Sequence, residues 1–164
     1  MPNPCSIALD ERGVATFGTE EGNEYKAVFL GPTFVDEPQL EGLIFDFSFE
    51  RTALGAARGA ADGRVWPTVE GLIRRFFDEA PFNVMSYTCE SSDARDRSRL
   101  RLFGRWHRQQ GRGFVQLPFL LPAGAAADGA VVGALLFRAD HPLRAVIEEC
   151  LRQELRVYAA AKQG

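Results

Sequence analysis

The pattern of apolar and polar positions predicts β-strands over the first fifty residues. The clearest strand spans residues 43–49, where apolar Phe45, Phe47 and Phe49 alternate with polar Asp46 and Ser48. A period of two buries one face of a strand and leaves the other in solvent. The phenylalanines are therefore predicted to be core rather than the lining of a ligand groove. Polar turns and weaker alternation predict shorter strands at residues 5–9, 14–18 and 24–30.

Apolar residues at helical spacing predict a first helix over residues 67–79, with Pro67 in its first turn. Its apolar stripe consists of Val69, Leu72, Ile73, Phe76 and Phe77. The next segment, 82–88, contains no charged residue, which is typical of a strand in the interior of a sheet. A second helix is predicted over residues 93–108, and Asp140 is expected to cap a third.

Two further apolar segments, 113–121 and 130–138, predict a hairpin, so the expected order of elements is β-β-β-β-α-β-α-β-β-α. This order indicates a single α+β domain with a mainly antiparallel sheet of about six or seven strands and three helices. The last helix carries an apolar stripe from Leu143 to Tyr158. We expect the stripe to pack on the sheet; the alternative is a homodimer formed through this helix.

Composition supports one core and limits the classes of partner. The chain has 164 residues, of which 46% are hydrophobic, and a net charge of -3. Residues 1–92 carry 15 acidic and 7 basic side chains, whereas residues 93–164 carry 7 and 12. The net negative charge argues against nucleic acid as the main partner, because phosphate binding needs clustered cations. The basic second half is compatible with an acidic protein partner or a small anion.

Cysteine usage and the N-terminus favour a cytoplasmic protein. The three cysteines, Cys5, Cys89 and Cys150, are widely spaced without a CxxC motif, which indicates free thiols. The chain opens without a basic and apolar leader, and no apolar run is long enough for a membrane span. Nucleotide-binding glycine motifs and HExxH are absent, so no cofactor and no metal are predicted. Cys89 is expected to be a buried, inert thiol rather than a nucleophile.

The predicted helix over residues 93–108 contains six arginines. At 100° per residue, one group falls opposite the apolar side and is expected to be solvated: Arg97, Arg101, Arg105 and Arg108. Arg99 instead falls between Phe103 and Trp106, in the middle of the apolar arc. A guanidinium in that position must pair with an internal carboxylate or face a ligand cleft, because a buried unpaired charge is costly. Structural pairing is the simpler interpretation, and a ligand-facing Arg99 is the alternative.

These residues form part of a longer pattern: Asp62-x-Arg64-Val65, Thr68-Val69, Phe76-Phe77, Cys89 and then Asp93-x-Arg95-x-x-x-Arg99-x-Arg101-Leu102-Phe103-x-x-Trp106. The pattern resembles a family of small bacterial proteins catalogued as a domain of unknown function, and the opening MPNPCSIAL and the length are similar too. The resemblance implies no activity. It implies that Asp62, Arg64, Asp93, Arg95, Arg99 and Trp106 belong to the family's pattern.

Chain geometry predicts that several of these residues gather at one end of the domain. The strand over residues 82–88 follows the first helix almost directly, so the two should run antiparallel. The end of the strand then returns towards the start of the helix, near Asp62 and Arg64, and the next helix starts there at Asp93. Two helix N-termini with Arg64 and Arg95 would attract a phosphate or carboxylate. The alternative is structural: Asp93 caps its helix, and Asp62 pairs with an arginine.

The predicted function is that of a non-enzymatic binding or regulatory module that engages an acidic partner or a small anion. The candidate binding residues are Asp62, Arg64, Asp93, Arg95, Arg99, Arg101 and Trp106. An enzyme of unknown reaction, acting on an anionic substrate in the same corner, is the alternative. Weak nucleic acid binding through the solvated arginines is the third possibility.

Nucleic acid binding can be tested through the solvated arginines. We expect no complex at physiological salt, because the acidic total opposes phosphate binding. Fluorescence anisotropy of a labelled duplex, titrated with protein at several salt concentrations, checks this. A nanomolar complex whose salt dependence flattens after charge reversal at Arg101 and Arg105 would contradict it.

Overall fold

A computed structural model describes residues 4–33, 35–53, 63–90, 104, 107–108, 113–122 and 130–161, of which 89–90, 121–122, 130–132 and 157–161 are described by backbone alone. The chain divides into two compact units. The first unit consists of Met1–Leu30 and Phe47–Ala80, and the second of Gly31–Asp46 and Pro81–Gly164. The prediction of a single domain stays a prediction, and each unit is described by itself.

The protein is α+β, with a seven-stranded mixed sheet in the order β1-β2-β3-β4-β5-β7-β6. The strands are β1 (Ile7–Leu9), β2 (Ala15–Gly18), β3 (Glu24–Leu30), β4 (Ile44–Ala53), β5 (Val84–Glu90), β6 (Phe114–Pro122) and β7 (Ala130–Arg138). The described residues also form two α-helices, α1 (Val65–Glu79) and α3 (Arg144–Ala161), and a short 3-10 helix, η1 (Pro38–Leu40). Every predicted strand is present; β3 and β7 have the predicted bounds, and the others begin or end at shifted positions.

Among the five strand pairs whose direction is described, one departs from the antiparallel pairing expected for most of the sheet. β4 and β5 run parallel, with Ile44 opposite Val84 and Asp46 opposite Ser86. Parallel neighbours need a crossover connection, usually a helix, and the segment between β4 and β5 contains α1. The pairs β1–β2, β2–β3, β5–β7 and β6–β7 are antiparallel.

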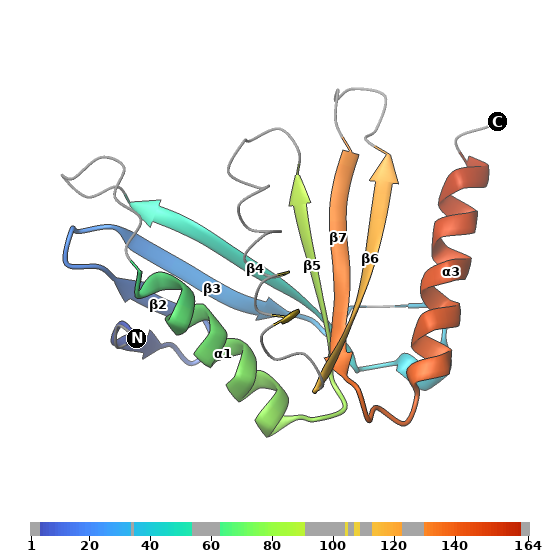
Figure 1. Ribbon diagram of the computed structural model, residues 1–164, viewed down its shortest axis with the longest axis horizontal. Helices are drawn as coiled ribbons and strands as arrows, with labels where there is room; N and C mark the ends of the chain where they lie inside the picture. The colour runs from blue at the N-terminus through green and yellow to red at the C-terminus, as the bar shows by residue number, and fades with distance from the viewer. Residues whose placement is uncertain are drawn as a thin grey trace. The chain divides into compact units, whose positions relative to one another are not determined.

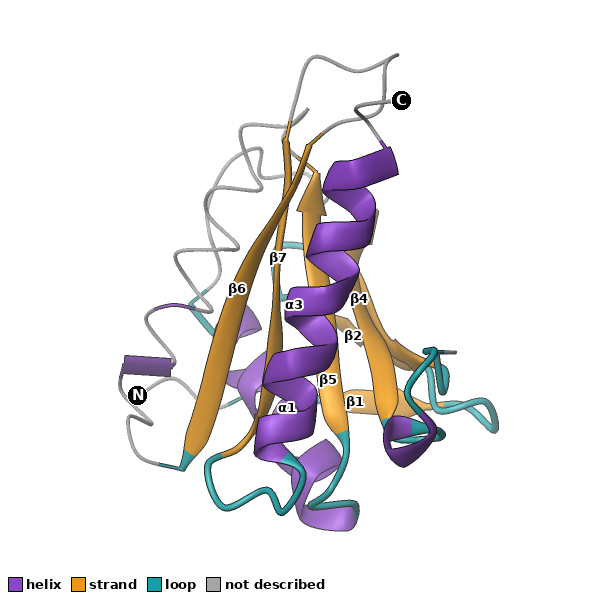
Figure 2. Ribbon diagram, turned by 90° about the vertical axis from the view of Figure 1, so that its right-hand side faces the viewer, coloured by secondary structure: helices purple, strands orange, loops and turns teal. Residues whose placement is uncertain are grey.

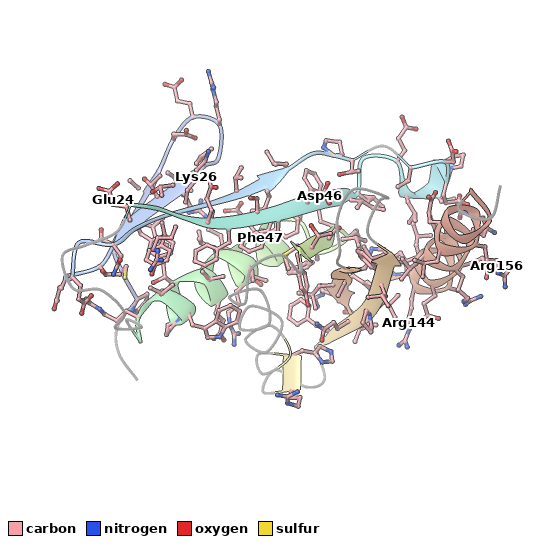
Figure 3. The ribbon with its side chains drawn as sticks, turned by 90° about the horizontal axis from the view of Figure 1, so that it is seen from above. Glu24, Lys26, Asp46, Phe47, Arg144 and Arg156 are labelled. Carbon is pink, nitrogen blue, oxygen red and sulfur yellow. The ribbon has the colours of Figure 1, made fainter. Side chains whose placement is uncertain are left out.

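In the first unit, α1 lies along one face of β2, β3 and β4 (Figure 1). The rings of Phe29 and Phe76 stack 4.1 Å apart, and Phe29 also contacts Phe47, whose ring lies 4.9 Å away. Phe47 is on the side of β4 that faces α1, and Glu24 and Lys26 are on the other side of the strands (Figure 3). Phe47 is buried, which confirms its predicted core position, whereas Phe45 and Phe49 are half-buried.

α1 begins two residues before the predicted start and ends at the predicted Glu79. Pro67 is tolerated in the first turn because its missing N–H would have no partner inside the helix. Val69, Leu72, Ile73 and Phe77 are buried, which confirms the apolar stripe, and Phe76 is half-buried.

In the second unit, β5 lies between β4 and β7, and Val84, Met85 and Tyr87 on it are buried. The prediction of an interior strand is therefore confirmed, although it begins later than expected. Phe82 precedes the strand in a turn and is 56% exposed. Gly133 of β7 pairs with Phe119 of β6 across the predicted hairpin. A Cβ atom at Gly133 would be 2.6 Å from the Tyr87 carbonyl oxygen and closer still to the Phe119 ring, so the position requires glycine.

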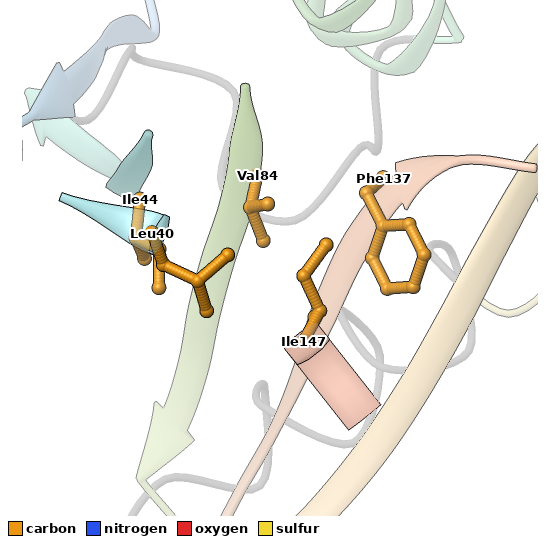
Figure 4. Packing of buried hydrophobic residues seen from close by; sticks show 5 residues of the cluster. All are labelled: Leu40, Ile44, Val84, Phe137 and Ile147. Atoms are coloured by element: carbon orange, nitrogen blue, oxygen red, sulfur yellow. The ribbon is translucent and has the colours of Figure 1, made fainter. Parts of the chain in front are cut away.

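α3 lies along the strands of the second unit (Figure 2). Leu40, Ile44, Val84, Phe137 and Ile147 form the buried cluster of this unit (Figure 4). Leu143, Val146 and Cys150 of the same stripe pack against it. The prediction that this stripe packs on the sheet is confirmed for these residues. Arg144 and Arg156, also on α3, are exposed (Figure 3).

The start of α3 differs from the prediction. Asp140 does not cap it; its carboxylate accepts hydrogen bonds from Arg138 at 3.0 and 3.1 Å, which lowers the pKa of Asp140. The buried His141 holds the turn that precedes the helix: its Nδ1 accepts from the Leu143 N–H at 3.0 Å. Its Nε2 donates to the Phe82 carbonyl oxygen at 2.8 Å. These two partners require a neutral ring with the proton on Nε2.

The predicted helix over residues 93–108 falls almost entirely outside the described residues. Only Gly104, His107 and Arg108 of it are described, and all three are helical. Arg108 is exposed, as expected. His107 Nε2 lies 3.1 Å from the Phe114 carbonyl oxygen.

Within the described ranges, no helix is both long enough and apolar enough to cross a membrane.

Replacing Phe47 with alanine should lower the free energy of unfolding by about 3–5 kcal/mol, because its buried ring would leave a cavity beside Phe29. Phe82→Ala is the matched control, since that ring is 56% exposed and its loss should cost about 1 kcal/mol or less. Urea denaturation measures both. Equal losses would contradict the core position of Phe47.

Candidate functional site

The structure describes only one of the predicted binding residues, Arg64. The others lie outside the described residues: Asp62, Asp93, Arg95, Arg99, Arg101 and Trp106. The predicted gathering of these side chains therefore stays a prediction. The backbone of Cys89 is described, in β5 opposite Val132.

Arg64 is the residue immediately before α1. Its Nη1 lies 2.8 Å from Oε1 of Glu20, and the two side chains are 25% and 83% exposed. Sequence reasoning did not find this partner, because Glu20 is 44 positions away and carries no distinguishing pattern. The ion pair is at the surface, where such pairs contribute little to stability.

A buried threonine holds the start of α1 against the N-terminal segment. Thr68 is completely buried, and its Oγ1 donates to the Arg64 carbonyl oxygen at 2.7 Å. The same oxygen accepts from the Cys5 N–H at 2.8 Å. The hydroxyl thus links the N-terminal segment to the first turn of α1 and fixes the backbone that carries Arg64. The sequence showed Thr68 only as one member of a pattern, without this role.

The first unit also contains a groove of about 250 Å³ that no sequence pattern predicts. Residues of β1, β2, β3, α1 and the first turn line it: Leu9, Arg12, Gly13, Ala15, Ala27, Phe29, Leu72, Arg75, Phe76 and Glu79. Ala15 and Ala27 are directly opposite each other on β2 and β3. Two short side chains at a cross-strand pair leave a hollow that larger residues would fill.

Three charged side chains line this groove. Arg75 Nε lies 2.6 Å from Oε1 of Glu79, one turn further along α1. Arg12 is exposed in the turn between β1 and β2. This turn is held by Asp10, whose Oδ1 accepts from the N–H groups of Arg12 and Val14 at 2.8 and 2.9 Å. A glycine at φ +74° completes the turn at position 13.

The Cys150 thiol is a poor nucleophile. Burial raises the pKa of the Cys150 thiol, and the charges of Glu154 and Glu37 raise it further. At neutral pH this thiol is therefore protonated. Cys5 is buried. Among the described residues, no three His, Cys, Asp or Glu side chains are grouped so that they could hold a metal ion.

Comparison with known proteins gives one match. The model of a protein family described as "Family of unknown function (DUF6169)" matches residues 61–150. No curated protein and no solved structure matches the chain. The matched region begins just before Arg64 and contains α1, β5, β6 and β7.

Thr68→Val should lower the free energy of unfolding by about 1–3 kcal/mol, because the buried Cys5 N–H loses its acceptor while the side-chain shape is kept. Hydrogen exchange of the Cys5 amide should accelerate in the same variant. Thr52→Val, at an exposed position of β4, is the control and should change stability by less than about 0.5 kcal/mol. An unchanged Cys5 exchange rate would show that the hydroxyl does not hold this segment.

Proposed function

The chain belongs to the DUF6169 family of unknown function, and from that premise we propose that it is a non-enzymatic binding or regulatory module. It engages a small anion or an acidic partner through the arginine-rich segment over residues 93–108 and the neighbouring Asp62 and Arg64. The region that the family model matches includes all of the proposed binding residues. The proposal places the protein in the cytoplasm, where its thiols stay reduced.

The observation that carries the proposal is the pairing of Arg64 with Glu20. The guanidinium stands at the start of α1 and is held by a carboxylate that is 83% exposed. A surface pair of this kind is worth about 0–1 kcal/mol, so giving up the Glu20 contact for an anionic ligand costs little. Arg64 does not cap α1 with its side chain, and the first turn contains no acidic residue. The positive end of the helix dipole therefore favours an anion beside Arg64.

Binding is better supported than catalysis. An enzyme acting on an anionic substrate in the same corner would need an activated nucleophile or a general base. Of the thiols whose side chains are described, Cys5 is buried, and the pKa of Cys150 is raised by burial. Neither has the electropositive, accessible surroundings that activate a cysteine.

Sulfate is a suitable probe for the proposed anion site. It should raise the melting temperature of the wild-type protein, because a ligand that binds only the folded state stabilises it, by about 2.7 kcal/mol at roughly a hundred times its Kd. Arg64→Gln should lose most of this sulfate-dependent shift. Arg74→Gln is the matched control, since Arg74 is on the same helix and pairs locally with Glu70 at 2.9 Å. Absence of a sulfate shift in the wild type would contradict the proposal.

Variants of Arg99 can distinguish an anion-binding site from a structural ion-pair network. If it binds the anion, Arg99→Met should keep the melting temperature and lose the sulfate shift. If it only pairs with Asp93, Arg99→Met should be destabilised and Asp93→Asn should rescue it in the double variant. Thermal unfolding of both variants, with and without sulfate, distinguishes the two outcomes. Rescue without any sulfate effect would assign the residues to architecture.

A further inference from the structure

We propose that the groove between α1 and the strands of the first unit binds a small amphipathic monocarboxylate, with its apolar body inside and its carboxylate on Arg12. This site goes beyond the proposed function, because none of its residues belongs to the Asp62 and Arg64 corner or to the arginine-rich segment. The proposal rests on the shape of the groove, its apolar lining and its charges.

The interior of the groove is apolar for a definite structural reason. Ala15 and Ala27 are 3% and 1% exposed and face each other across β2 and β3, so neither fills the space beneath α1. Phe29 and Phe76 stack with an interplanar angle of 1°, and their paired rings form part of the lining. Leu72 adds an aliphatic surface from α1. An apolar group that enters this space is removed from water, which is the main source of affinity in small-molecule sites.

The charges favour a single negative charge on the ligand. Two arginines and one glutamate line the groove, and Glu79 is bound to Arg75. Within the described parts of the chain, the guanidinium of Arg12 has no partner. The Asp10 carboxylate, two residues earlier in the turn, accepts from backbone N–H groups through its Oδ1. Arg12 can therefore form the two parallel hydrogen bonds that a guanidinium makes with a carboxylate.

The size and polarity of the groove narrow the ligand class further. Its volume of about 250 Å³ is below the range of roughly 300–1,000 Å³ that is usual for drug-sized ligands. A nucleotide or a peptide would not fit. A phosphate dianion would place two charges against an apolar lining, at a large desolvation cost. An aromatic or short aliphatic monocarboxylic acid is small enough for the groove and carries only one negative charge.

The test is isothermal titration calorimetry of the full chain with phenylacetate. We expect binding in the millimolar range or tighter, and affinity at least about tenfold weaker for phenylacetamide, which has the same shape without the charge. Phenethylamine, which has the opposite charge, should not bind. Sulfate should not compete, since it has no apolar body.

Two variants test the two halves of the site. Arg12→Gln, at an exposed turn position, should weaken phenylacetate binding about tenfold or more and leave the melting temperature unchanged. Ala27→Leu should fill the hollow and abolish binding. If Ala27→Leu fails to fold, the phenylacetate affinity of Arg12→Gln tests the proposal by itself. Arg74→Gln, whose side chain is exposed and does not line the groove, is the control and should bind like wild type.

Failure of phenylacetate to bind the wild-type protein would overturn the proposal. Equal affinity of phenylacetate for Arg12→Gln and for the wild type would also overturn it. Arg64→Gln should bind phenylacetate normally. That result separates this site from the sulfate site proposed above, so either proposal can fail without the other.

Discussion

The parallel pairing of β4 with β5 determines the path of the chain. Parallel neighbours cannot be joined by a tight turn, so the chain leaves β4, forms α1 and returns before β5 begins. The pairing places Ile44 beside Val84, and these two side chains join Phe137 and Ile147 in the buried cluster of the second unit. The burial of these apolar side chains offsets the conformational entropy that is lost when strands far apart in the sequence become ordered.

The sequence predicted those parts of the fold that depend on local periodicity. The period of two identified β4, the absence of charge identified β5 as interior, and the helical spacing predicted where α1 ends. It did not predict the parallel pair, because alternation is the same for both directions of pairing. The bond between His141 and the Phe82 carbonyl oxygen, the contact of Arg64 with Glu20 and the hollow over Ala15 all arise between distant segments. No periodic signal reports such contacts.

The arginines of the described residues show how differently one residue type is used. Four of them pair with a carboxylate three or four residues away on the same helix, as Arg74 does with Glu70 and Arg144 with Glu148. Such pairs lie on the solvent-exposed surface, and each contributes only about 0.3–0.5 kcal/mol to stability. Arg64 differs, because Glu20, with which it forms an ion pair, comes from a distant turn. A count of arginines along a sequence therefore says less about binding than the separation between each arginine and its partner.

Gly133 has a consequence for how the hairpin of β6 and β7 finds its alignment. The Phe119 ring and the Tyr87 carbonyl oxygen occupy the space where a Cβ atom would stand. A slip of β7 by one residue would bring Val132 or Ala134 into this space, and either side chain would collide with the ring or the backbone. The glycine therefore selects the register sterically: among neighbouring registers, only the native one leaves room for the Phe119 ring against β7.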